Sequence, residues 1–112
     1  MSAFEEFEKE VVRVLLRPHM EPEEIAVVLE SATQVSFEPT GAGYFLTVRH
    51  SCLPKERIVC SEPLLTGTGG DIDCGFVVFL ENEELTFECH SWGDTAIPDD
   101  FRKREVEVRG AA

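Results

Sequence analysis

Apolar and polar residues near the N-terminus follow the period of an amphipathic helix. Charged residues lie between the members of an apolar stripe made of Phe4, Phe7, Val11, Val14 and Leu15. This spacing predicts a helix from about Ala3 to Arg17, which Pro18 ends. Because Ser2 and Glu5 have the spacing of a capping box, we place the N-terminal cap of this helix at Ser2.

A second, shorter helix is predicted directly after the first. Pro22 suits the first turn of a helix, and the two glutamates that follow it suit the positive end of the helix dipole. Apolar residues at Ile25, Val28 and Leu29 supply the face that would be buried. We expect this helix to end near Ala32.

The rest of the chain has the alternation of short strands separated by turns. We predict strands at 34–38, 44–49, 57–60, 74–80, 85–90 and 103–108, and glycine-rich turns at 39–43 and 67–70. Val35 and Phe37 should share one face of their strand, and Val106 and Val108 one face of theirs. Helices followed by strands predict an α+β fold, in which residues 1–112 form a single domain. Two N-terminal helices would pack on one face of a mostly antiparallel sheet of about five to six strands.

Residues 75–90 can be paired as a hairpin with a two-residue turn at Asn82 and Glu83. One side of this hairpin then has only apolar pairs, namely Leu80 with Leu85, Val78 with Phe87 and Phe76 with Cys89. The other side pairs Glu81 with Glu84, Phe79 with Thr86, Val77 with Glu88 and Gly75 with His90. A slip of one residue would mix the two sets, so the pattern fixes the register.

The second side of this hairpin has two interpretations that the sequence leaves open. Val77 and Phe79 among carboxylates would form a half-exposed recognition patch if nothing covers them. Alternatively, the C-terminal strand or the loop at Trp92 covers both residues. Trp92 itself is then either a plug on the sheet or an anchor in an interface.

The distribution of charge limits the partners that this surface would attract. The formal net charge is −12, and ten acidic residues but no Lys or Arg lie between Ile58 and Phe101. Such a field repels nucleic acid and anionic lipid, and it speeds encounter with cationic surfaces. The alternative is that the acidic residues serve solubility alone.

Composition and the N-terminus indicate a globular protein of the cytoplasm. A hydrophobic fraction of 43% with eight Phe excludes a disordered chain. No apolar run approaches the length that crosses a bilayer, and the acidic start at Glu5 and Glu6 does not resemble a secretory signal. We therefore expect a cytoplasmic protein that does not bind membranes.

The four cysteines lack any C-x-x-C pair, so in a reducing compartment we expect free thiols. A metal site that uses Cys89 and His90 with His50 and Cys52 is the sharper alternative. Because adjacent residues of a strand point to opposite faces, Cys89 and His90 are poor co-ligands. We expect neither a metal nor a cofactor.

Catalytic motifs are weak in this sequence. The glycines at 67–70 lack the following helix that a phosphate loop needs, and the neighbouring Asp71 and Asp73 fall far short of a Ca²⁺ loop. A Cys–His nucleophile pair would need the thiolate, which surrounding acids disfavour. Glu88 and Asp94 could serve as the carboxylates of a hydrolase, but acids are too frequent here for that pair to be informative. No catalytic residue is assigned.

Two stretches of the chain resemble a group of small bacterial proteins of unknown function. The first is Thr40-Gly41-Ala42-Gly43-Tyr44-Phe45, and the second is the hairpin GFVVFLENEELTFE at 75–88 with Ser91-Trp92-Gly93-Asp94 after it. The resemblance covers roughly the last two-thirds of the chain and implies no activity and no catalytic residue. The chain departs from the group at Cys89 and His90, where bulkier or aromatic residues would be expected.

Taken together, these features predict a non-enzymatic acidic protein that docks a basic protein partner, in its most concrete form an inhibitor or immunity protein for a cationic toxin. The expected docking residues are Phe79, Glu81, Glu84, Glu88, His90, Trp92, Asp94, Asp99 and Asp100. One alternative is a homodimeric structural or assembly module. Another is a small hydrolase or a metal-binding protein.

Overall fold

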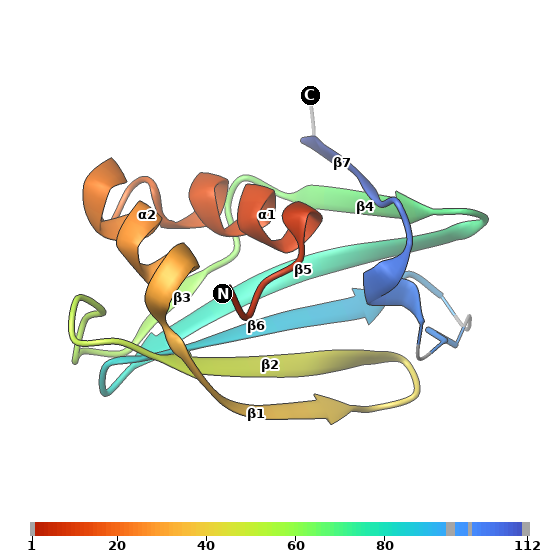
Figure 1. Cartoon of the computed structure of the whole chain (residues 1–112). Helices are drawn as coiled ribbons and strands as arrows, with labels where there is room; N and C mark the ends of the chain where they lie inside the picture. Colours follow the sequence, from red (N-terminus) through yellow and green to blue (C-terminus); the bar gives the residue numbers. More distant parts are fainter. Residues whose placement is uncertain (1, 94–95, 99, 111–112) are drawn as a thin grey trace.

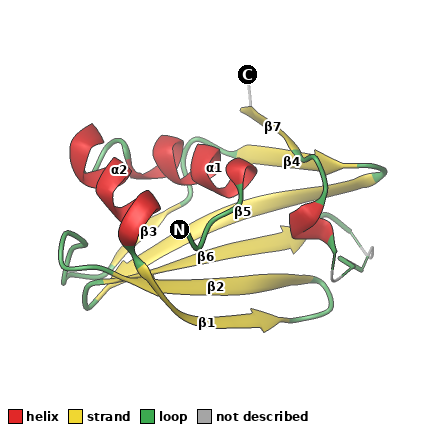
Figure 2. Cartoon of the chain, viewed as in Figure 1, coloured by secondary structure: helices red, strands yellow, loops and turns green. Residues whose placement is uncertain are grey.

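Two helices precede the strands of the sheet, as the hydrophobic pattern predicts (Figures 1 and 2). The computed structural model describes residues 2–93, 96–98 and 100–110. The helices are α1 (Glu6–Leu16) and α2 (Pro22–Ser31), and a single 3-10 turn, η1, spans Phe101–Lys103. The strands are β1 (Thr33–Pro39), β2 (Gly43–Arg49), β3 (Ile58–Cys60), β4 (Leu65–Gly69), β5 (Ile72–Glu81), β6 (Glu84–Ser91) and β7 (Glu107–Gly110).

All strands belong to one sheet with the order β1-β2-β6-β5-β4-β7, and every pairing is antiparallel. β3 pairs with the second half of β5, whereas β4 pairs with its first half. The structure therefore confirms the α+β architecture with an antiparallel sheet. The seven strands exceed the five to six predicted because β4 occupies a segment for which no strand was predicted.

The central hairpin has the predicted register throughout. Leu80 pairs with Leu85, Val78 with Phe87 and Phe76 with Cys89, and all six side chains are buried. The turn residues Asn82 and Glu83 have φ angles of 54° and 62°. Two successive positive φ angles define the type I′ turn, whose twist matches that of the flanking strands.

The first helix begins later than predicted because a different pair of residues caps it. The N-cap is Glu5, not Ser2, and a capping box joins it to Glu8. Ser2 instead donates a hydrogen bond to the carbonyl of Leu29 at 2.5 Å, which ties the N-terminal segment to α2. The second helix has the predicted bounds, with Pro22 in its first turn.

The prediction of a turn at 67–70 is wrong, because most of this segment is β4. Glycines are placed at two inward-facing positions of the strand because neighbouring rings fill the space. A Cβ on Gly67 would lie 2.6 Å from the Phe76 ring, and one on Gly69 would lie 2.8 Å from the Phe101 ring. Because two inward-facing residues of this strand are glycines, its sequence lacks the hydrophobic alternation by which strands are predicted.

Two other strand predictions need smaller corrections. In β1, an irregularity between Gln34 and Ser36 interrupts the alternation, so Val35 stands at a bulge and is 52% exposed. The last strand, β7, starts at Glu107 rather than at residue 103. Val106 and Val108 do both pack against the core.

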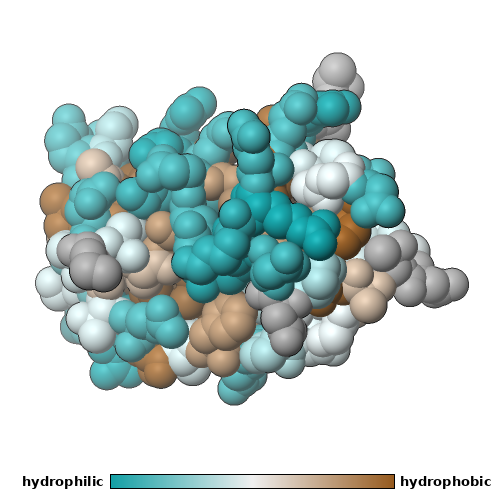
Figure 3. All heavy atoms as spheres, turned by 45° about the vertical axis from the view of Figure 1, so that its right-hand side comes forward, coloured by the Kyte–Doolittle hydropathy of each residue, from teal (hydrophilic) through white to brown (hydrophobic). Residues whose placement is uncertain are grey.

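Both helices lie on the same side of the sheet, which curves around α1 (Figure 1). The core lies between the helices and the sheet, and it contains the apolar stripes of the helices and the inward side chains of β2, β4, β5 and β6. The surface turned forward in Figure 3 is mostly hydrophilic, with apolar side chains in small separate patches. Among the described helices, none has the length and apolarity needed to cross a membrane.

Candidate functional site on the open sheet face

The side of the sheet that faces away from the helices brings most of the predicted docking residues together. Alternation along three adjacent strands directs one set of side chains to this side, and we call this set the open face. It consists of Phe45, Thr47 and Arg49 from β2, Glu84, Thr86, Glu88 and His90 from β6, and Val77, Phe79 and Glu81 from β5. Six of the nine predicted docking residues lie here or, in the case of Trp92, directly after β6.

The open face has an apolar centre. Phe45, Val77 and Phe79 are half-buried, and Val59 pairs with Phe79 and is 49% exposed at the margin. The C-terminal strand does not cover Val77 and Phe79, because β7 pairs with β4 at the edge of the sheet. The prediction that the C-terminal strand covers Val77 and Phe79 is therefore wrong.

Trp92 combines features of a plug and of an anchor. A Cβ on Gly75 would lie 2.8 Å from both Trp92 Nε1 and His90 Nε2, so these two side chains rest against the backbone of β5 at Gly75. Trp92 nevertheless stays 47% exposed. Within the described residues, His90 Nδ1 is buried and has no hydrogen-bond partner. The aromatic side chain is thus held in place and still presents a ring to solvent.

The charges of the open face are acidic and only partly neutralised. Arg49 forms an ion pair with Glu84, which stands directly opposite Glu81 across the hairpin. This ion pair offsets the repulsion expected between like charges in directly opposed positions. Glu81 and Glu88 form no ion pair with any residue that the structure describes.

Three predicted docking residues are not placed on this surface. Asp94 and Asp99 lie outside the described residues. Asp100 is exposed and pairs with Arg104 at 3.4 Å. It precedes Phe101, which enters the core on the helix side against Phe7, so Asp100 is not part of the open face.

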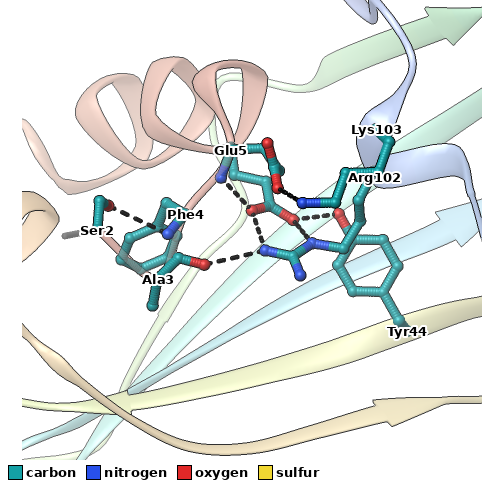
Figure 4. Close-up of polar contacts among 8 residues, drawn as sticks. Ser2, Ala3, Phe4, Glu5, Tyr44, Arg102 and Lys103 are labelled. Atoms are coloured by element: carbon teal, nitrogen blue, oxygen red, sulfur yellow. Dashed lines mark hydrogen bonds and ion pairs between the residues drawn. The ribbon is translucent and has the colours of Figure 1, made fainter.

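On the helix side, a buried ionic network joins both ends of the chain to the sheet (Figure 4). The carboxylate of Glu8 is fully buried and accepts two hydrogen bonds from Arg102, both at 2.8 Å. It also accepts the backbone N–H of Glu5 at 2.7 Å and the hydroxyl of Tyr44. The Arg102 guanidinium lies 5.1 Å from the ring centroid of Phe37 and 5.7 Å from that of Tyr44.

The surroundings of this network keep Arg102 charged and Tyr44 neutral. Burial is the largest single influence and disfavours the charge of Arg102, but the hydrogen bonds to Glu8 and the nearby negative charges, first that of Glu8, together outweigh it and raise the pKa of the guanidinium. Burial, followed by the negative charge of Glu8, raises the pKa of Tyr44. Sequence reasoning missed this network. The available signal was a glutamate beside Phe7 on the apolar stripe of the first helix, where a buried carboxylate needs a partner that donates hydrogen bonds or carries positive charge.

A cavity of about 130 Å³ lies beside the network and is lined in part by Phe37, Tyr44, Phe101 and Arg102. Its two polar side chains, Tyr44 and Arg102, already bind Glu8. Among the described residues that line the cavity, both polar side chains are therefore already engaged.

The thiols and imidazoles do not form a reactive centre within the described residues. Burial raises the pKa of the Cys60 thiol to about 11, and a hydrogen bond with Cys74 together with burial raises that of Cys89. Cys89 points into the core and His90 to the open face, as expected for neighbours in a strand. In the part of the chain that the structure describes, no three His, Cys, Asp or Glu side chains are grouped to hold a metal ion.

The chain matches no protein-family model, and it has no significant match among curated proteins or solved structures.

Proposed function

We propose that this chain is a non-enzymatic binding protein whose open face docks a basic protein partner. The observation that carries this proposal is a half-apolar sheet face in which the half-buried Phe45, Val77 and Phe79 stand among the carboxylates of Glu81 and Glu88, and which no helix or strand of the described residues covers. Apolar groups that stay accessible beside charges are typical of the centre and rim of an interface.

Charge complementarity supports a cationic occupant. The formal net charge is −12, and no Lys or Arg occurs between Ile58 and Phe101, the segment that supplies two of the three strands of the open face. A basic protein would be steered toward this field, and the rim carboxylates would raise its association rate. An inhibitor or immunity protein for a cationic toxin is the most specific form of this proposal.

The same charges argue against self-association through the open face. In a two-fold symmetric dimer each patch meets its own copy, so Glu81 and Glu88 of both subunits would gather in one interface. Like charges in that position oppose dimer formation. A heterologous basic partner avoids this repulsion, which is why we favour it over the homodimeric module.

Affinity capture from the native host with matched charge variants tests the proposal. Glu81→Gln/Glu88→Gln removes two carboxylates from the open face. Glu10→Gln/Glu23→Gln removes two exposed carboxylates from the helices, so the two variants have the same net charge as each other. A basic protein retained by the wild type and the helix variant, but lost by the open-face variant, is the expected result. Equal retention by both variants, or an acidic partner, would contradict the proposal.

A further inference from the structure

From the arrangement around Glu88 we infer an arginine subsite on the open face, one that prefers a guanidinium to the ammonium of lysine. The inference rests on the proposed function and specifies the chemistry by which the partner is recognised. The centre of the open face would hold an arginine side chain of the partner.

The strand register places Glu88 directly beside one aromatic residue and diagonally from a second. Glu88 pairs with Phe45 on β2 and with Val77 on β5, and Phe79 is its diagonal neighbour because it pairs with Thr86. β2 and β5 lie about 9.5 Å apart, since neighbouring strands are separated by about 4.8 Å, and Phe79 is offset by a further two residues along β5, so the backbones at Phe45 and Phe79 are about 12 Å apart. A planar group that enters between the half-buried rings of Phe45 and Phe79 would meet the Glu88 carboxylate.

Arginine suits this arrangement better than lysine does. A guanidinium is flat, weakly hydrated and able to bind a carboxylate through two N–H groups while its plane contacts an aromatic ring. An ammonium is compact and strongly hydrated, so it gains less from the rings.

The protein already holds one of its own arginines in this way. Arg102 binds Glu8 with two hydrogen bonds while its guanidinium lies over the rings of Phe37 and Tyr44. On the open face a carboxylate likewise has aromatic neighbours, with Phe45 directly opposite Glu88 and Phe79 at the diagonal position. Within the described residues no cation of the chain pairs with Glu88, because Arg49 is engaged by Glu84 and Arg109 by Glu107.

Two peptides of equal charge test this inference. The probes are acetylated and amidated (Gly-Arg)₄ and (Gly-Lys)₄, with binding measured by calorimetry at low salt. We expect the wild type to bind the arginine peptide about 3- to 5-fold more tightly, as cation–π contacts at a half-exposed site allow. The double variant Phe45→Leu/Phe79→Leu keeps apolar side chains and removes the rings, so the ratio should fall below about 2.

Charge variants separate this inference from the function on which it rests. Glu88→Gln should weaken binding of both peptides, and Glu23→Gln on α2 should weaken neither to the same extent. If the wild type binds both peptides equally, or if the leucine variant keeps the preference, the arginine subsite is refuted while the docking function stands. If neither peptide binds, or if Glu23→Gln weakens binding as much as Glu88→Gln, the docking function itself fails. Circular dichroism on each variant shows that loss of binding does not reflect unfolding.

Discussion

Among single residues, Glu8 is unusual because it places a carboxylate inside the core. The carboxylate of Glu8 has no exposed surface, and the folded protein compensates it with Arg102, Tyr44 and the backbone of Glu5. Removing one member of a buried ion pair is costly, because the charge that remains has lost its partner. Arg102 thus acts as a clamp between the start of the chain and its end.

The clamp can be tested by comparing neighbouring basic residues. Arg102→Met should lower the free energy of unfolding by about 3–5 kcal/mol, since it leaves Glu8 buried and unpaired. Lys103→Met is the matched control, because Lys103 pairs with Glu5 at the surface, and such pairs contribute about 0–1 kcal/mol. Urea denaturation measures both values. Equal losses in the two variants would show that the buried network has no special role.

The four thiols differ in burial, and we expect their reactivity to differ for that reason. Cys52 is half-buried, whereas Cys60, Cys74 and Cys89 are buried. Because only the thiolate is nucleophilic and the pKa of Cys60 is raised to about 11, we expect one fast-reacting thiol per native chain at neutral pH.

Titration with a chromogenic disulfide before and after denaturation checks this expectation. One thiol should react rapidly in the native protein and four after unfolding. A raised thiol pKa also means that the folded state holds its proton more tightly than the unfolded state. The stability from this source is therefore complete below the unfolded thiol pKa of about 8.5 and declines as the pH rises toward 11. Rapid reaction of all four thiols in the native state would contradict the burial of Cys60, Cys74 and Cys89.

At the scale of elements, the central hairpin was predictable and its neighbour β4 was not. The hairpin register follows from the residues themselves, since strict alternation and a two-residue turn leave one pairing in which Val78 meets Phe87. β4 has no such signature, because two of its inward positions are Gly67 and Gly69, where rings from β5 and η1 occupy the space that a side chain would need. The open face was predicted for β5 and β6 by the same alternation.

Features that depend on distant parts of the chain escaped prediction. Glu8 and Arg102 are 94 positions apart, so no local pattern indicates that they meet. The bulge at Val35 depends on the pairing of β1 with β2, so the alternation of residues in β1 alone does not predict it. Whether Val77 and Phe79 are covered likewise depended on the position of β7, which sequence alone did not give.

The hairpin turn can be strengthened at one position. Glu83 has a φ of 62°, a conformation that costs a residue with a Cβ about 1 kcal/mol and costs glycine little. Glu83→Gly should therefore raise the free energy of unfolding by about 0.5–1 kcal/mol in thermal or urea denaturation. Glu83→Ala removes the same charge but keeps the Cβ, so it should give no such gain. Equal effects of the two substitutions would indicate that charge, and not backbone conformation, governs the turn.

At the scale of the whole molecule, the helices and the charges divide the protein into two different sides. The helices bury one face of the sheet, and the other face combines accessible rings with carboxylates in a chain of net charge −12. This division is the basis of the proposed docking of a basic partner.

Kinetics with a captured basic partner separate the contributions of charge and of the aromatic side chains. Rising salt should slow association and change dissociation less, because steering depends on the summed field. Trp92→Ala should instead speed dissociation and weaken binding by about 2 kcal/mol if the exposed part of its ring contacts the partner. Association rates that do not vary with ionic strength would leave solubility as the explanation of the acidic residues.

The most direct measurement is a nuclear magnetic resonance titration of the isotope-labelled protein with the (Gly-Arg)₄ peptide, which locates binding residue by residue. We expect amide shift changes to concentrate in β2, β5 and β6, at Phe45, Phe79 and Glu88 and their neighbours, and the Trp92 indole signal to move with them. Shift changes that centre on the outer surfaces of α1 and α2, or that spread evenly over all acidic residues, would contradict the open face as the docking site.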